Sequence, residues 1–257
     1  MNDLALIILI GLTQGFLEWL PVSSSGILTL ILKYYNYTQA YDLSLLLHLG
    51  TTLAVIVKYR DIYFKPIKEG KLTMDIKRII IATVASLPVG LVTYLISKKI
   101  VLLDLSLLSL IMGIFLIALA CLIKRSRTKL HTRTVSDRDM PIVGLAQGLS
   151  TLPGISRSGV TLFTLLSLKI KNQDAVKWSF IIAPPVILGA FIFEIIQSNT
   201  LFNLNLDIII IGNLIAFISG YITMEMFLNM ARKVGFEKFT LITGLMLTLS
   251  SIINLAA

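Results

Sequence analysis

GLAQGLSTLPGISRSGVTLF, residues 144–163, decides the fold, because a second copy of its pattern lies near the start of the chain. GLTQGFLEWLPVSSSGILTL, residues 11–30, agrees with it at seven of twenty positions when the two are aligned without a gap at an offset of 133. The shared residues include Gly, Gln and Ser as well as Leu, which favours a true repeat over a chance match of apolar sequence. We therefore interpret the two segments as equivalent parts of an internal repeat.

The composition is that of an integral membrane protein. Hydrophobic residues make up 56% of the 257 residues and charged residues 14%, and the mean hydropathy is +0.86. Too little polar sequence remains to cover a soluble domain. We predict an all-α polytopic membrane protein that forms a single integral membrane domain over residues 1–257. Six apolar runs approach the ~20 residues needed to cross a bilayer, and they lie near 43–57, 79–97, 101–123, 178–197, 206–230 and 238–256.

Two further apolar regions, 4–34 and 141–168, are interrupted by clusters of Pro, Gly and Ser. Such clusters break helices, so each region is predicted to form two short helices joined by a polar bend. Each half of the chain then holds one broken hairpin and three spans, and an odd number of spans inverts the second half relative to the first. The sequence thus predicts six transmembrane helices plus two re-entrant helical hairpins in an inverted-topology repeat. Repeat 1 covers about 1–124, repeat 2 about 140–257, and a basic cytoplasmic loop, 124–140, joins them.

The formal net charge of +9 comes from Lys and Arg residues in the loops. Four loops hold most of them, with seven in 58–78, six in 124–138, three in 169–177 and three in 232–238. If 141–168 leaves and returns to the cytoplasmic side, nineteen basic residues lie inside and three outside, against thirteen and nine if it crosses. The positive-inside rule therefore favours the re-entrant hairpin, and the charge requires no nucleic-acid partner. The one basic residue outside this count is Arg157, at the tip of the hairpin.

Polar side chains gather at the first bend. Gln14 and Glu18 are four residues apart, so a helix places both on one face. A carboxylate at membrane depth indicates a functional site, unless it lies near the interface or only pairs with Arg157. Ser23, Ser24 and Ser25 follow, and they either cap a helix or face a ligand.

The second bend combines groups that bind phosphate. Pro153-Gly154 breaks the first short helix, and Ser156-Arg157-Ser158 begins the next, which continues through Thr161. A helix N-terminus with free N–H groups, hydroxyls and a guanidinium suits phosphate oxygens. The alternative is a purely structural ion pair between Arg157 and Glu18, which would not need a serine on each side of the arginine.

The two motifs, Gln14-x-x-x-Glu18 with PVSSSG and PGISRSGVT, together resemble the undecaprenyl-diphosphatase family, the bacitracin-resistance phosphatases. The resemblance covers the whole chain. It implies a multi-pass protein of the cytoplasmic membrane whose site opens to the extracytoplasmic side. The implied reaction hydrolyses a polyprenyl diphosphate lipid to the monophosphate plus inorganic phosphate, which recycles the lipid carrier for cell-envelope glycan synthesis. The sequence is also compatible with a homodimer.

The resemblance implies roles for individual residues as well. Glu18 matches the essential acidic position and, with Gln14, is associated with a divalent cation, Mg²⁺ or Ca²⁺. Ser24 matches a serine proposed as nucleophile or phosphate contact, so Glu18, Ser24 and Arg157 are the expected catalytic residues. The residues expected to bind the diphosphate are Ser23, Ser24, Ser156, Arg157, Ser158 and Thr161.

One position departs from the family pattern. Well-studied bacterial members carry a His directly after the Ser-Gly of the first motif, where this chain has Ile27. Isoleucine can neither transfer a proton nor act as a nucleophile. His48, in LLLHLGT, is the one His at membrane depth. It either replaces the missing group or is a hydrogen-bonded packing residue.

Other functions remain open from the sequence alone. Inverted repeats around a midplane site are common in transporters, so a flippase of the same lipid is the main alternative, and the missing histidine strengthens it. An ion channel or exchanger built on Glu18 and Arg157 explains neither the serines nor the paired motifs. Away from the bends, Glu194 is expected at the outer interface of the fourth span, and Pro184-Pro185 is expected to kink that span.

Overall fold

The computed structural model describes residues 3–37, 39–127, 132–197, 206–230 and 236–256, and its regular elements there are helical. Its helices include six segments long and apolar enough to cross a membrane, which confirms the predicted all-α polytopic architecture. These segments are Ala40–Lys58, Met74–Ile100, Leu105–Ser126, Asn172–Ile196, Ile209–Asn229 and Phe236–Leu255.

Two of the six spans consist of two helices each. α3 (Ala40–Leu46) and α4 (His48–Lys58) meet at Leu47, and α10 (Asn172–Ile181) and α11 (Ala183–Gln197) meet at Ile182. The expected kink at Pro184-Pro185 is thus a break slightly earlier, because a proline lacks an N–H and its ring clashes with the preceding turn. The other spans are the single helices α6 (Met74–Ile100), α7 (Leu105–Arg127), α12 (Leu206–Met230) and α13 (Phe236–Ala256).

The two interrupted regions form pairs of short helices. α1 (Asp3–Leu17) and α2 (Ser24–Tyr34) are joined by the bend at 18–23, and α8 (Met140–Gly148) and α9 (Arg157–Ser167) by the bend at 149–156. Each of these four helices is shorter than the ~20 residues needed to cross a bilayer. The remaining elements are α5 (Arg60–Glu69) and the 3₁₀ turns Asp137–Asp139 and Leu149–Thr151.

The segments before α8 and after α9 contact each other. The Lys171 N–H donates to the carbonyl of Arg133 at 3.0 Å, in an isolated bridge beside Ile170. Both ends of the α8–α9 pair therefore lie at the same end of the molecule. Residues 128–131 of the basic loop 124–140, and residues 231–235 of the last basic loop, lie outside the described residues.

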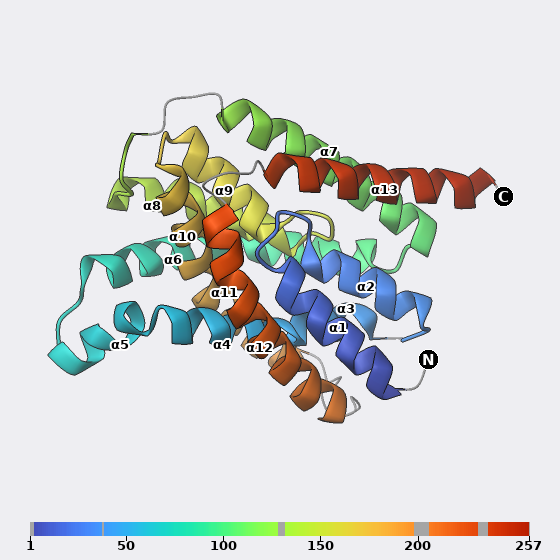
Figure 1. Ribbon diagram of the computed structural model, residues 1–257, viewed down its shortest axis with the longest axis horizontal. Helices are drawn as coiled ribbons and strands as arrows, with labels where there is room; N and C mark the ends of the chain where they lie inside the picture. Colours follow the sequence, from blue (N-terminus) through green and yellow to red (C-terminus); the bar gives the residue numbers. More distant parts are fainter. Residues whose placement is uncertain (1–2, 38, 128–131, 198–205, 231–235, 257) are drawn as a thin grey trace.

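The first residues of α6, which follow the loop that contains α5, lie at the same end of the molecule. Lys77 Nζ and Arg78 Nε each lie 2.9 Å from the carboxylate of Asp137. Hydrogen bonds from these two side chains hold the pKa of the Asp137 carboxyl below its usual range. In Figure 1 this end, with α5, lies at the left, whereas both chain termini lie at the right.

Helices from the two halves of the chain pack against each other. α1 packs along α12, α8 packs along α6, and α7 lies beside α13 (Figure 1). Glycine permits the close approach of the first two pairs. A Cβ on Gly15 would lie 2.6 Å from the backbone N of Gly220, and one on Gly144 would lie 2.2 Å from the carbonyl oxygen of Ala82. Each short helix pair is thus held against the second span of the other half.

Candidate functional site

The bends of the two short helix pairs meet, as the repeat predicted. The Gly154 N–H donates to Ser23 Oγ at 3.1 Å, and Ser158 Oγ donates to the carbonyl of Leu20 at 2.9 Å. Ser23 has a φ of 61°, a left-handed conformation that is uncommon for a residue other than glycine. Such backbone persists where its surroundings hold it, and it clusters at functional sites. The two bends therefore form one structural unit.

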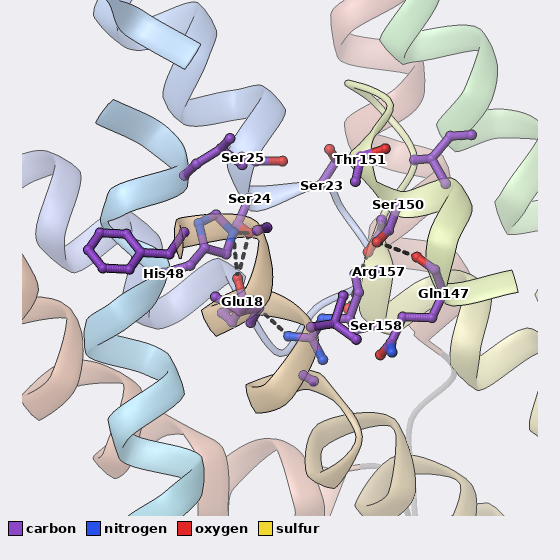
Figure 2. A pocket seen from close by; sticks show the side chains of 18 of the residues that line it. Glu18, Ser23, Ser24, Ser25, His48, Gln147, Ser150, Thr151, Arg157 and Ser158 are labelled. Carbon is purple, nitrogen blue, oxygen red and sulfur yellow. Dashed lines mark hydrogen bonds and ion pairs between the residues drawn. The ribbon is translucent and has the colours of Figure 1, made fainter. Parts of the chain in front are cut away.

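A cavity of about 80 Å³ lies at this junction. The first residues of α2 and of α9 both line it, so the N-termini of two helices border one space. Free N–H groups and the positive ends of two helix dipoles favour a bound anion there. Figure 2 shows Glu18 between His48 and Arg157. The polar residues of the lining are Glu18, Ser23, Ser24, Ser25, His48, Gln147, Ser150, Thr151, Ser156, Arg157 and Ser158.

Glu18 joins the two motifs. Its carboxylate is buried; Oε1 pairs with Arg157 Nη2, and Oε2 accepts from Ser24 Oγ at 2.7 Å. Arg157 Nη1 also donates to the carbonyl of Ser179 at 2.8 Å. The ion pair that the sequence left as an alternative is present, and Arg157 also lines the cavity. Glu18 and the Ser179 carbonyl thus hold Arg157 beside the space that an anion would occupy.

His48 lies beside the same carboxylate. Its Nδ1 donates to the carbonyl of Ser44 at 2.8 Å. Its Nε2 faces the cavity, 3.2 Å from Glu18 Oε2 and 3.4 Å from Ser24 Oγ. Ile27 instead packs against the apolar core. The structure thus places an imidazole within reach of the Ser24 hydroxyl, although the chain has no histidine at position 27.

Gln14 lies directly behind Glu18. Its Nε2 donates to Glu18 Oε2 at 2.9 Å and to Thr51 Oγ1 at 3.2 Å. Among the described residues, its Oε1 is buried without a hydrogen-bond partner. Gln14 does not line the cavity. It is connected to the cavity only through its hydrogen bond to Glu18.

Glu18 and Gln14 are the residues of the first bend that could hold a divalent cation. Across the described ranges of the chain, no three His, Cys, Asp or Glu side chains converge on one point. Mg²⁺, however, is usually held by one or two carboxylates together with substrate phosphates and waters. The Glu18 carboxylate and the unpartnered Gln14 Oε1 are oxygen donors of this kind.

The expected phosphate-binding residues of the second motif occupy different positions. Ser156 caps α9, where its Oγ accepts from the Gly159 N–H at 3.2 Å. Ser156 and Ser158 line the cavity, but Thr161 is fully buried and does not. The Thr161 hydroxyl donates to the carbonyl of Arg157 at 2.8 Å. Its position therefore supports the first turn of α9 rather than contacting the cavity.

The chain matches a family of known proteins over almost its whole length. The family model described as bacitracin resistance protein BacA matches residues 7–247. This chain belongs to the BacA family.

Relatives within the BacA family cover most of this chain and carry the name undecaprenyl-diphosphatase. A protein of Methanothrix thermoacetophila is 34% identical over 249 residues, which are 95% of this chain and 94% of the relative. One of Methanococcoides burtonii is 32% identical over 265 residues, 97% and 99% of the two chains. One of Sulfurisphaera tokodaii is 33% identical over 239 residues, which are 88% of this chain and 89% of the relative.

In this BacA-family chain, a second buried acid lies outside the two bends. Glu194, expected at the outer interface of its span, is only 1% exposed within the protein. Its Oε1 accepts from Lys98 at 2.9 Å, its Oε2 pairs with Tyr94, and Lys98 also binds Asp42 at 2.7 Å. These contacts tie α3, α6 and α11 together. The partners are far apart in sequence, so no local pattern signals that they meet.

Sequence reasoning also missed three cavity residues, Gln147, Ser150 and Thr151. For Gln147 a signal was available, because it is the repeat partner of Gln14. Like Gln14 in this BacA-family structure, it is buried, and its Oε1 is without a hydrogen-bond partner among the described residues. The repeat therefore places one buried amide beside each bend.

Proposed function

We propose that this BacA-family protein is an undecaprenyl-diphosphate phosphatase. It hydrolyses undecaprenyl diphosphate, or a related polyprenyl diphosphate, to the monophosphate plus inorganic phosphate. The observation that carries the proposal is the cavity bordered by two helix N-termini, where Arg157 and Glu18 from separate bends meet beside Ser24. The names of the relatives support the same reaction and do not favour the flippase. Release of the monophosphate recycles the lipid carrier, which accounts for bacitracin resistance.

The residues of the cavity have different roles in the proposed phosphoryl transfer. Arg157 and the N–H groups of α2 and α9 hold phosphate oxygens and stabilise their charge as it redistributes in the transition state. The oxygen of Ser24, or of a water beside it, forms a bond to the terminal phosphorus as the bond from phosphorus to the bridging oxygen breaks. The proton of the attacking hydroxyl passes to Glu18 or His48, both within reach of Ser24 Oγ. Water hydrolyses the phosphoserine if Ser24 attacks first.

A divalent cation, Mg²⁺ or Ca²⁺, is part of the proposed site. Glu18, which lines the cavity, and Gln14 Oε1, which is buried behind Glu18, are the protein groups that would hold it. When bound, such an ion neutralises charge on phosphate oxygens. Gln14 is neutral, so this chain supplies one negative charge to the ion from these two residues.

Phosphate release by purified protein tests this function. With undecaprenyl diphosphate and Mg²⁺ or Ca²⁺, we expect inorganic phosphate and the lipid monophosphate in equal amounts, and no release from undecaprenyl monophosphate. Chelation of divalent ions should lower the rate at least about tenfold, because loss of even one contact that supports a metal ligand costs about 10–100-fold. Passage of intact lipid diphosphate across a proteoliposome bilayer without phosphate release would instead support the flippase.

The same proposal includes an inverted-topology repeat with two re-entrant hairpins, α1–α2 and α8–α9. Support comes from the shortness of the four helices and from the contact between Arg133 and Lys171 at the two ends of α8–α9. In addition, α1 of the first half packs along α12 of the second, and α8 of the second half packs along α6 of the first. Two inverted halves would produce this reciprocal packing. Irregular backbone at membrane depth is tolerated where protein buries it or where it lines a cavity, as both bends do.

We place the opening of the cavity on the extracytoplasmic side of the cytoplasmic membrane. Thr151, a cavity residue, accepts through its carbonyl from Tyr41 at 2.9 Å. Tyr41 also lies beside Lys98, one of the few basic residues assigned to the outside. The cavity is therefore linked to the side that carries few positive charges.

Cysteine labelling tests the topology. After Cys121→Ser, single cysteines would replace Arg138 and Lys171, which flank α8–α9, and Leu102, between α6 and α7; all three positions are exposed. A membrane-impermeant maleimide added to intact cells should label Leu102→Cys alone, and Arg138→Cys and Lys171→Cys only after permeabilisation. Labelling of Arg138→Cys and Lys171→Cys from opposite sides would show that α8–α9 crosses the membrane.

A further inference from the structure

A second cavity, of about 190 Å³, adjoins the site between α6 and α11. Four residues, Gln147, Thr151, Val186 and Ala190, line both this space and the cavity that contains Arg157. The two spaces are therefore neighbours with a common wall. We call the second space the α6–α11 groove and define it by Leu87, Gly90, Leu91, Pro185, Gly189 and Phe193.

We propose that the α6–α11 groove binds the isoprene unit next to the diphosphate of the substrate. This inference rests on the proposed function, because it requires the diphosphate to occupy the Arg157 cavity. The head of a polyprenyl diphosphate can lie there only if its hydrocarbon chain leaves through an apolar wall. A dry cavity of about 150 Å³ holds one benzene molecule, so the groove has room for about one isoprene unit.

The groove also faces the lipid. Leu87 and Leu91, in its α6 wall, are 57% and 49% exposed. Both belong to a membrane-spanning helix, so their exposed surfaces meet hydrocarbon. A chain that passes through the groove therefore continues directly into the bilayer, where the rest of the tail can remain.

The equivalent helices of the other half, α4 and α12, are closed against each other. The Gly50 N–H donates to Asn213 Oδ1 at 2.7 Å, and a Cβ on Gly50 would lie 2.2 Å from the Asn213 carbonyl oxygen. By contrast, a Cβ on Gly189 would meet nothing within 4 Å, and one on Gly90 would have its nearest neighbour at 3.8 Å. Close packing explains the glycine at position 50 but not the one at 189. The opening is therefore particular to the α6–α11 side.

Filling the groove tests the proposal. Gly189→Leu places a side chain in open space, so the fold should tolerate it. The neighbouring Leu188 is 37% exposed and lies outside the groove, so Leu188→Phe is the matched control on the same helix. Gly189→Leu should raise KM for farnesyl and undecaprenyl diphosphates at least about tenfold, since single methylene changes in apolar pockets have effects of that order. Leu188→Phe should leave KM unchanged.

A photoreactive farnesyl diphosphate with a diazirine on its first isoprene unit gives a readout that does not depend on turnover. In the wild-type protein it should crosslink to α6 and α11, and Gly189→Leu should abolish these crosslinks. Crosslinks to α4 and α12, or an unchanged KM in Gly189→Leu, would overturn the inference while phosphate release by the wild type still upheld the proposed function. Wild-type crosslinks at the groove without phosphate release would overturn the proposed function instead.

Discussion

Arg157→Ala is expected to lower kcat/KM for undecaprenyl diphosphate by at least about 10³-fold, the lower range for an arginine that stabilises a phosphoryl-transfer transition state. Arg157 lines the cavity at the N-terminus of α9, and its guanidinium is held by Glu18 and by the Ser179 carbonyl. Alanine removes the only Arg or Lys side chain among the described residues that line this space. Phosphate release under steady-state conditions measures the loss.

Arg157→Lys tests whether a positive charge alone supports the reaction, and Arg133→Ala is the control. Arg157→Lys keeps a positive charge but lacks the planar guanidinium, whose several N–H groups can bind Glu18 and the phosphate at the same time. It should therefore retain only part of the wild-type activity. Arg133→Ala removes another arginine from an ion pair, that with Asp139, at the basic end of the molecule. It should leave kcat/KM unchanged. A folded Arg157→Ala protein with wild-type kcat/KM would contradict the assignment.

Glu18→Gln is expected to reduce both activity and stability. The amide keeps the size of the side chain but leaves the Arg157 guanidinium without its buried counter-charge, and disrupting a buried pair costs about 3–5 kcal/mol. It also removes the carboxylate that accepts from Ser24 and faces His48. We expect kcat/KM to fall at least about 10²-fold, as after loss of one preorganised group, and Tm to fall as well.

Glu225→Gln is the matched control for that variant. Glu225 pairs with Lys58, the first basic residue of the loop 58–78, at an exposed position near the end of its span, where exposed pairs contribute about 0–1 kcal/mol. Its kcat/KM and Tm should stay close to those of the wild type. If Glu18→Gln behaves in the same way as Glu225→Gln, the Glu18–Arg157 pair neither orients the arginine nor takes part in the reaction.

Most of the fold could be predicted from the sequence because hydropathy reports directly on the length of a membrane span. The breaks within two spans were harder to predict. No breaker residue marks the break at Leu47, between α3 and α4, and the packing of α4 against α12 is a long-range contact that the local sequence does not report. At Ile182 the signal was present in Pro184-Pro185, but proline acts on the turn before it.

The site was predictable where the repeat carried the information. The two bends, with Ser23 and Ser156 as equivalent residues, were expected to meet, and they do. Spacing alone could not show which neighbour a side chain faces. Thr161 was therefore expected to bind phosphate, although its hydroxyl bonds to its own helix. The contacts of His48 with Glu18 and Ser24 depend on how α4 packs beside the first bend, which no local motif describes.

The most direct test of the central claim, that the two bends form one diphosphate site, is an experimental structure with a non-hydrolysable polyprenyl methylenediphosphonate. The phosphonate groups should lie between the N-termini of α2 and α9, with the terminal group in contact with Arg157 and beside Ser24 Oγ. Phosphonate density at the basic loops around Arg133 and Lys171, with the cavity between the bends free of it, would contradict the account.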